Sequence, residues 1–253
     1  MVSSNQLRSA WREGRETYGV WCSVPNSFSA ELVAVAGCDY VCVDLQHGMV
    51  DFSSVVPMMQ GIISAGAAPV VRVPRNDPQS IGKALDAGAS GVIVPLVESV
   101  EAAKAAAAAF RYPPDGGRSY GPTRASIVAA TPTPEDFEDV ACIVMVETQA
   151  GLAHVGEIAA VTGIDAIYIG PADLAVTLGV RGALQERDDV HEEAITRIRE
   201  TCAARGVIAG IHCKEGEGAR ARREQGFQMI TVGHDALLLR LGAIRELAAA
   251  RRH

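Results

Sequence analysis

The stretch from residue 69 to residue 94, PVVRVPRNDPQSIGKALDAGASGVIV, contains the pattern that decides the expected fold. It begins and ends with short apolar runs rich in β-branched residues, Pro69–Val73 and Gly91–Val94. Because neither run alternates apolar with polar residues, each is typical of a parallel strand buried on both faces. Between them, Ser80–Ala87 has a helical pattern that starts after Asp77 and stops at Gly88. The stretch therefore predicts a strand, a helix and a second strand parallel to the first.

The same alternation continues along the chain. Further apolar runs of this kind occur at Tyr18–Val24, Tyr40–Val43, Cys142–Val146, Ala166–Ile169, Val207–Ile211 and Gln228–Val232. Further helical patterns occur at Ala30–Ala36, Phe52–Ala65, Ala102–Phe110, Leu152–Val161, Val190–Ala204, Gly216–Gln225 and Ala236–Ala249. Eight strands alternating with helices predict a single (β/α)8 TIM barrel domain over residues 1–253. The alternative is an open doubly wound sheet, which more often has a glycine-rich phosphate loop after its first strand, and the sequence has neither GxGxxG nor GxxxxGK[ST].

Composition narrows the classes of function. The chain has 23 basic and 30 acidic residues, a net charge of −7, which argues against a generally basic nucleic-acid binder. No apolar run approaches the roughly 20 residues of a membrane-spanning helix, and the first residues lack the apolar centre of a signal peptide. The six cysteines include no CxxC pair and are typical of buried, reduced thiols rather than of a zinc site. We therefore expect a cytoplasmic protein with no membrane or nucleic-acid partner.

In a barrel of this kind the active site lies where the strands end at their carboxyl termini. Polar residues that follow the expected strands are Asp44, Gln46, His47, Arg72, Glu147, Asp173, His212, Lys214 and His234. Glu147 and Asp173 follow neighbouring strands, and two carboxylates in one mouth repel each other unless a cation lies between them or one stays protonated. A hard divalent ion would satisfy both. The alternative is that Glu147 starts a helix and Asp173 caps one.

Two further residues have both a functional and a structural interpretation. His47 follows a strand and precedes Gly48 in an expected exposed turn, so it is either a catalytic residue or a core histidine with its hydrogen bonds satisfied. Arg72 at a strand end would bind a substrate carboxylate with its planar guanidinium, or would form an ion pair with Asp44 or Glu147. These two interpretations of Arg72 are compatible.

Six motifs, in this order and spacing, resemble the HpcH/HpaI family of class II pyruvate aldolases. They are DLQHG (44–48), VRVPRNDP (71–78), LDAGASGVIVP (85–95), RYPPDGGRSYG (111–121), VETQAG (146–151) and IGPADL (169–174). The resemblance extends from about residue 11 to about residue 247. It implies a (β/α)8 fold, a divalent metal ion (Mg, Mn or Co), and a 2-oxo acid and an aldehyde as substrates. It also implies a homo-oligomer built from dimers that exchange a C-terminal helix, often assembled into hexamers.

The resemblance also implies roles for individual residues, motif by motif. Glu147 and Asp173 resemble the metal-binding pair, and Arg72 resembles the residue that stabilises the enolate. His47 resembles the catalytic base, and Asp86 resembles the carboxylate that raises its basicity. The remaining assignments are Asp44, which resembles an acid that holds the site together near the arginine, and the Gly170, Pro171, Ala172 and Asp173 turn, which resembles the segment that binds the pyruvate carboxylate.

Two positions depart from the family pattern and bear on the second half of the substrate. Gln46 stands where many members have Glu, and Met145 stands where many have a substrate-binding Gln.

Three other functions remain as alternatives: a Schiff-base aldolase using Lys214, a CoA-ester lyase of the same superfamily, and a non-catalytic oxo-acid-binding barrel. The amphipathic pattern LLLRLGAIRELAAARR (237–252) suits an exchanged helix, although packing on its own barrel is the default expectation.

Overall fold

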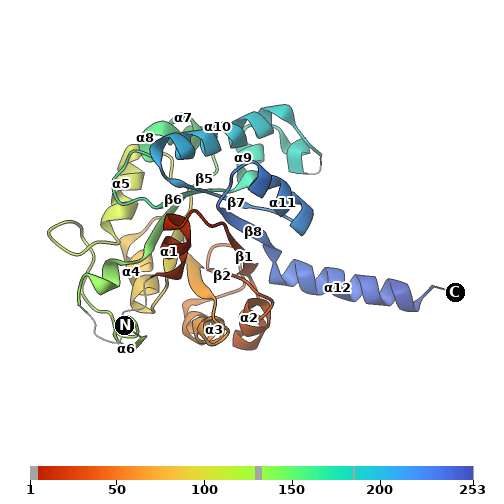
Figure 1. Ribbon diagram of the computed structural model, residues 1–253, viewed down its shortest axis with the longest axis horizontal. Coiled ribbons are helices and arrows are strands. Elements are labelled where there is room, and N and C mark those ends of the chain that lie inside the picture. The colour runs from red at the N-terminus through yellow and green to blue at the C-terminus, as the bar shows by residue number, and fades with distance from the viewer. Residues whose placement is uncertain (1–4, 129–132, 185, 253) are drawn as a thin grey trace.

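The computed structural model describes residues 5–128, 133–184 and 186–252 and contains a closed parallel barrel (Figure 1). Its strands follow one another around the barrel in chain order from β1 to β8. They are β1 (Thr17–Cys22), β2 (Tyr40–Asp44), β3 (Ala68–Arg72), β4 (Gly91–Val94), β5 (Ala141–Val146), β6 (Ala166–Ile169), β7 (Ile208–His212) and β8 (Met229–His234). Every neighbouring pair is parallel, including β8 with β1, so the (β/α)8 prediction is confirmed.

Helices connect these strands on the outside of the barrel. They are α1 (Gln6–Arg12), α2 (Ser27–Ala34), α3 (Phe52–Ser64), α4 (Pro78–Asp86), α5 (Val100–Ala108), α6 (Ala125–Val128), α7 (Gln149–Ala153), α8 (Val155–Ile158), α9 (Pro171–Thr177), α10 (Asp189–Arg205), α11 (Gly216–Glu224) and α12 (Asp235–Ala250), with short 3₁₀ turns at Asp136–Glu138 and Arg181–Leu184. The sequence pattern did not predict α1, α6 or α9. The helix expected at Leu152–Val161 is instead divided into α7 and α8 at His154, whose ring Nδ1 lies 3.0 Å from the carbonyl oxygens of Glu98 and Ala150.

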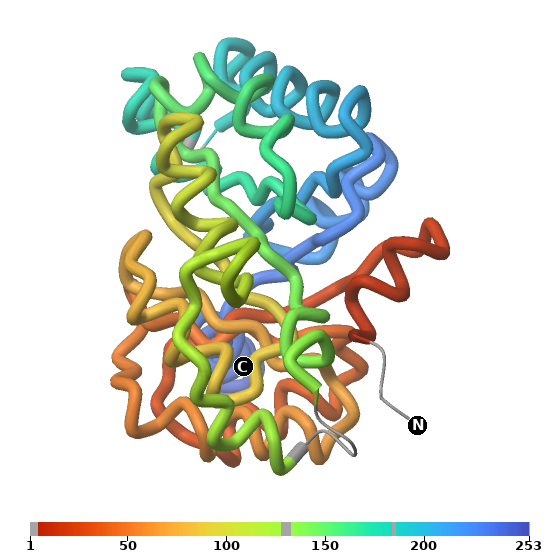
Figure 2. Tube along the Cα trace, turned by 90° about the vertical axis from the view of Figure 1, so that its left-hand side faces the viewer, coloured from red at the N-terminus to blue at the C-terminus, as the bar shows by residue number. Residues whose placement is uncertain are grey.

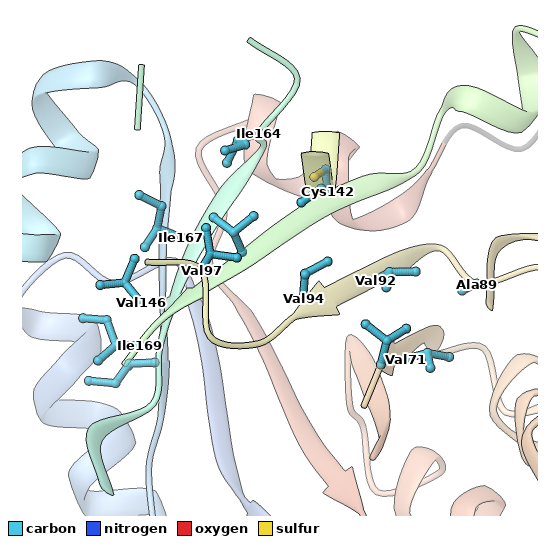
Figure 3. Close-up of a cluster of buried hydrophobic side chains, with 14 of the residues drawn as sticks. Val71, Ala89, Val92, Val94, Val97, Cys142, Val146, Ile164, Ile167 and Ile169 are labelled. Atoms are coloured by element: carbon cyan, nitrogen blue, oxygen red, sulfur yellow. The ribbon is translucent and has the colours of Figure 1, made fainter. Parts of the chain in front are cut away.

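The apolar strands serve two cores, which is why they read as unbroken apolar runs. Alternate residues such as Val92 and Val94 face the helices and pack with Val146 and Ile167 (Figure 3). The residues between them, such as Ile93, point into the barrel and fill it. Both faces of each strand are therefore removed from water.

Helix α1 covers the amino end of the barrel. Leu7 and Trp11 belong to the inner core, and the indole nitrogen of Trp11 donates a hydrogen bond to Thr17 Oγ1 at 3.1 Å, at the start of β1. A ligand would therefore enter from the carboxyl ends of the strands.

Helix α12 leaves the barrel instead of packing on it. It extends to one side in Figure 1 and is seen nearly end-on in Figure 2. Its apolar side chains Leu238, Leu239, Leu241, Ile244 and Leu247 are exposed, Leu239 to 74%. The default expectation that this helix packs on its own barrel is therefore wrong.

The first residue of α12 is nevertheless held firmly. Asp235 is buried and its carboxylate accepts hydrogen bonds from the backbone N–H groups of Ser23 and Val24, at 2.9 and 3.1 Å.

Within the residue ranges that the structure describes, no helix is both long and apolar enough to cross a bilayer.

Candidate active site

A cavity of about 380 Å³ opens at the carboxyl ends of the strands. It brings together side chains that are far apart in the sequence because parallel strands of a barrel all end on one face. Its lining residues are Trp21, Ser23, Asp44, His47, Arg72, Met145, Glu147, Gly170, Pro171, Ala172, Asp173, Ala183, His191, His212, Lys214 and His234. Of the residues to which the family resemblance gives a role, all but Asp86 line this cavity, whereas Gln46 does not.

Asp44 and Arg72 are joined across the ends of β2 and β3. Arg72 Nε donates to Asp44 Oδ1 at 2.8 Å, and Nη2 donates to Oδ2 at 2.7 Å. Asp44 Oδ1 also accepts from the backbone N–H groups of Gln46 and His47, at 3.0 and 3.3 Å. Burial by itself would raise the pKa of Asp44, but the hydrogen bonds and charge of Arg72, with the two amides, lower it below its usual value. Asp44 therefore orients the arginine and the exposed turn that carries His47 at the same time.

Trp21 supports the other side of the same arginine. The guanidinium carbon of Arg72 lies 4.3 Å from the centre of the Trp21 ring, which is a cation–π contact. The imidazole of His212 meets the same indole edge-on, with 5.1 Å between ring centres. Burial first, and then the charge of Arg72, lower the pKa of His212 to about 4, so this imidazole is neutral at pH 7.

Glu147 is a buried carboxylate with one unpaired oxygen. It is only 2% exposed, and its Oε1 accepts a hydrogen bond from the backbone N–H of Leu96 at 2.9 Å. Leu96 has a φ of +55°, a left-handed conformation that non-glycine residues adopt rarely and that clusters at functional sites. The other oxygen of Glu147, Oε2, is buried without any hydrogen-bond partner.

Asp173 is the second carboxylate of this pair. Burial first, and then the neighbouring Asp173, raise the pKa of Glu147 to about 7, although the amide of Leu96 and the charge of Arg72 act in the opposite direction. Gly170 allows the two carboxylates to meet, because a Cβ at this position would overlap Glu147 Oε2. Asp173 itself lies in the first turn of α9, three residues after Gly170.

This donor set fits a hard divalent cation. Two facing carboxylates, one with an unpaired buried oxygen and a raised pKa, repel each other and would be stabilised by such an ion. In the parts of the chain that the structure describes, no group of three or more His, Cys, Asp or Glu side chains forms a metal cage. An ion held here would therefore keep open positions for substrate and water, as catalytic ions do.

The structure does not bring Asp86 to His47 within one chain. Asp86 is the last residue of α4, which runs back from the carboxyl end of β3 to the amino end of β4, so it lies at the opposite end of the barrel. There its carboxylate accepts a hydrogen bond at 3.0 Å from Nη2 of Arg118, whose side chain is almost completely buried. The pairing implied by the resemblance therefore does not form inside a single protomer.

His191 is a cavity residue that the sequence analysis missed. It lies in the first turn of α10, is 6% exposed, and its Nε2 is 2.8 Å from the carbonyl oxygen of Pro171. Nothing marks it in the sequence, because it follows no strand and belongs to none of the six motifs. Only its position at the start of α10, the next α-helix after the one that begins in the Gly170–Asp173 turn (the GPAD turn), could have suggested it.

The fold and the site together define a (β/α)8 enzyme whose mouth can hold a divalent cation beside an arginine and a histidine. Comparison with known proteins gives the family. Residues 17–240 match the family described as HpcH/HpaI aldolase/citrate lyase. The chain therefore belongs to the HpcH/HpaI aldolase/citrate lyase family.

Relatives and solved structures agree with this assignment over the full length. A hydroxypyruvate/pyruvate aldolase of Rhizorhabdus wittichii is 38% identical, covering 98% of this chain and 99% of the relative. A 4-hydroxy-2-oxo-heptane-1,7-dioate aldolase of Salmonella dublin is 36% identical, covering 98% and 94%. The crystal structure of a family member from Burkholderia cenocepacia J2315 superposes with a TM-score of 0.91 at 33% identity, covering 98% of this chain and 100% of that one.

Proposed function

We propose that this protein is a metal-dependent pyruvate aldolase, a carbon–carbon lyase. It adds pyruvate or hydroxypyruvate to an aldehyde, and in reverse it cleaves a 4-hydroxy-2-oxo acid into the 2-oxo acid and the aldehyde. The observation that carries this proposal is the unpaired oxygen of Glu147 facing Asp173 in the cavity that also contains Arg72 and His47. Relatives named for both activities, at 35–38% identity over nearly the whole chain, support the same reaction class.

Glu147 and Asp173 would hold the divalent ion, for which Mg, Mn and Co are the candidates. When bound, the ion supplies a Lewis acid that makes the methyl protons of the 2-oxo acid more acidic. The two carboxylates contribute a fixed position for that charge, because Oε1 of Glu147 is held by the amide of Leu96.

Arg72 is proposed to stabilise the negative charge that develops on the keto oxygen as the enolate forms. Its guanidinium is already oriented by Asp44 and by the ring of Trp21, so little reorganisation is needed when the charge appears. The first turn of α9, from Gly170 to Asp173, is proposed to bind the carboxylate of the 2-oxo acid.

His47 is proposed to move the proton. The C–H bond of the methyl group breaks, the proton passes to the imidazole directly or through a water molecule, and the electron pair forms the new bond to the aldehyde carbon. The resulting alkoxide takes a proton back. His47 is exposed at the mouth, next to the amides held by Asp44, so it can reach a substrate that enters from solvent.

We also propose that the working form is a homo-oligomer built from dimers that exchange α12. The helix leaves the barrel with its apolar side chains exposed, and a second exposed apolar group consists of Phe28 and Leu32 of α2 with Val35 directly after it. Apolar patches of this extent usually mark an interface. A second copy of α12 would cover both. We propose further that such dimers combine into hexamers.

The cytoplasm is the proposed location. All six cysteines are free thiols, and five of them are buried. Proteins with this cysteine usage are typical of a reducing compartment.

Proton exchange tests the proposed reaction directly. In D2O, the methyl signal of pyruvate should disappear from the NMR spectrum only when the protein and Mg, Mn or Co are both present, and EDTA should stop the exchange. Binding of pyruvate without exchange would leave a non-catalytic oxo-acid-binding barrel as the function. Lys214 lines the same cavity, so exchange that persists in EDTA, with trapping of pyruvate by borohydride, would establish a Schiff-base aldolase instead.

A further inference from the structure

The first turn of α9 is tied to a neighbouring helix by one buried imidazole. His191 Nε2 lies 2.8 Å from the carbonyl oxygen of Pro171, and a carbonyl oxygen only accepts, so Nε2 carries the proton. The residues on either side of Pro171 are the ones that form the site: Gly170 makes room for Glu147, and Asp173 is the exposed partner carboxylate.

Helix α9 depends on its neighbours for its position: Leu174 and Ala175 are fully buried, and the helix packs against the turn at Arg181–Leu184 and against α10. It is seven residues long, and its N-cap residue Gly170 has no side chain to cap the free amides. Pro171 has a fixed φ but contributes no N–H group. An isolated helix of this length is not stable in water, so its position depends on its tertiary contacts.

Helix α10, in contrast, is a rigid support, and it packs beside α9 (Figure 1). It has 17 residues and buries Ile195 and Ile198 against the barrel. Glu192, next to His191, forms a bidentate ion pair with Arg222 of α11, at 2.6 and 2.8 Å. The backbone N–H of His191 is itself held by the N-cap carboxylate of Asp188 at 3.0 Å.

We infer that His191 is a positioning residue: its hydrogen bond to the Pro171 carbonyl fixes the first turn of α9, so that Asp173 stays opposite Glu147. The inference rests on the proposed function, in which these two carboxylates hold a divalent ion. His191 touches neither carboxylate in this arrangement. Its effect passes through the backbone of α9, and groups of this kind commonly change metal affinity by about 10- to 100-fold when they are removed.

The test compares three substitutions at His191 with one control on the same helix. His191→Leu and His191→Asn both lose the bond, the first by removing the donor and the second because its side chain is too short. His191→Gln keeps an N–H donor at a similar reach. Ile195→Val removes one buried methyl group from α10 without touching α9.

Mn²⁺ affinity, measured by EPR titration without substrate, is the readout that a merely structural role would not change. We expect the Leu and Asn variants to bind Mn²⁺ about tenfold more weakly, with a raised KM for pyruvate and a kcat within about threefold of the original at saturating metal. The Gln variant should bind Mn²⁺ within about threefold of the unmodified protein. Ile195→Val should lower the melting temperature but leave the Mn²⁺ affinity unchanged.

The outcomes separate this inference from the proposed function. If the unmodified protein binds no Mn²⁺ and shows no pyruvate proton exchange, the proposed function fails and this inference fails with it. If the unmodified protein does both, but the Leu and Asn variants bind Mn²⁺ as tightly as it does, only the role of His191 is overturned. The same holds if Gln weakens binding as much as Asn does. Should the Leu variant not fold, the comparison of Asn with Gln decides the question alone.

Discussion

The guanidinium of Arg72 and the carboxylate of Asp44 face each other across the ends of two neighbouring strands and share two hydrogen bonds, at 2.7 and 2.8 Å. Both side chains are only 7% exposed. This pair connects three parts of the site, since Asp44 also holds the amide of His47 and Arg72 also lies over Trp21.

Substituting Arg72 by Lys keeps the charge but removes the planar fork. Because an ammonium group cannot satisfy both Asp44 oxygens and a developing enolate in the same geometry, we expect kcat/KM for aldol cleavage to fall by about 100-fold or more. The control is Arg8→Lys, which changes an arginine paired with Asp139 and Asp165 elsewhere on the barrel. A loss of less than about fivefold in Arg72→Lys would show that the fork is not needed.

Substituting Asp44 by Asn leaves a buried guanidinium without its counter-charge. We expect the free energy of unfolding, from urea titration, to drop by about 3–5 kcal/mol, as is usual when one partner of a buried pair is removed. Adding Arg72→Met to this variant should recover part of the loss, since no unpaired charge then remains. Equal stabilities of the single and double variants would contradict this account.

The raised pKa of Glu147 predicts a pH dependence that a Gln substitution should remove. Without metal, the folded protein holds a proton on Glu147 below about pH 7, whereas the unfolded chain releases it near 4.5. The folded state thus binds more protons in this window, so this group contributes stability at low pH that is lost as the pH rises to about 7. In EDTA, we expect the stability of Glu147→Gln relative to the original protein to increase as the pH is raised from 5 to 8. An unchanged difference in melting temperature at the two pH values would argue against the raised pKa.

A methyl group at Gly170 should displace the paired carboxylates. The Cβ of Gly170→Ala would occupy the space of Glu147 Oε2, so we expect Mn²⁺ affinity to fall by about tenfold or more. Gly156→Ala in α8 is the matched control, because no atom lies within 4 Å of its added Cβ. Isothermal titration calorimetry with Mn²⁺ measures both variants, and equal affinities would refute the steric argument.

The exposed apolar side of α12 should be the part of the chain that holds an oligomer together. Replacing Leu241 and Ile244 with Glu places charges in the middle of this surface. We therefore expect the particle in solution to have half the mass of the original assembly or less, as measured by analytical ultracentrifugation. Arg240→Glu, on the same helix, controls for charge alone. If the double variant sediments like the unmodified protein, α12 is not the interface.

The strands were predictable because burial on both faces leaves a local signature. Gly91–Val94 and Ala166–Ile169 have the predicted bounds, and each of the other strands differs by one or two residues at one or both ends. Helix α9 was not predictable in the same way. Its seven residues are too few for a helical period to stand out, and its start depends on contacts with Glu147 and His191 rather than on its own pattern.

Strand ends and motifs identified most of the cavity residues, but they did not give the pairings among them. Whether Arg72 would pair with Asp44 or with Glu147 was open from the sequence, and the neighbouring register of β2 and β3 places Asp44 opposite Arg72. Asp86 lies in a motif as specific as the others, yet the direction of α4 carries it to the other end of the barrel. The amphipathic α12 has the pattern of a packed helix, and only the tertiary structure shows that its own barrel does not cover it.

The order of the residues along this chain determined the barrel and the end at which chemistry occurs, because burial and strand direction are properties of local segments. The three-dimensional structure decided which charges touch, which carboxylate oxygen lacks a partner, and which imidazole supports the GPAD turn. The hydrogen bonds involved join residues 28, 51 and 20 positions apart, and their distances and burial depend on how the whole barrel closes.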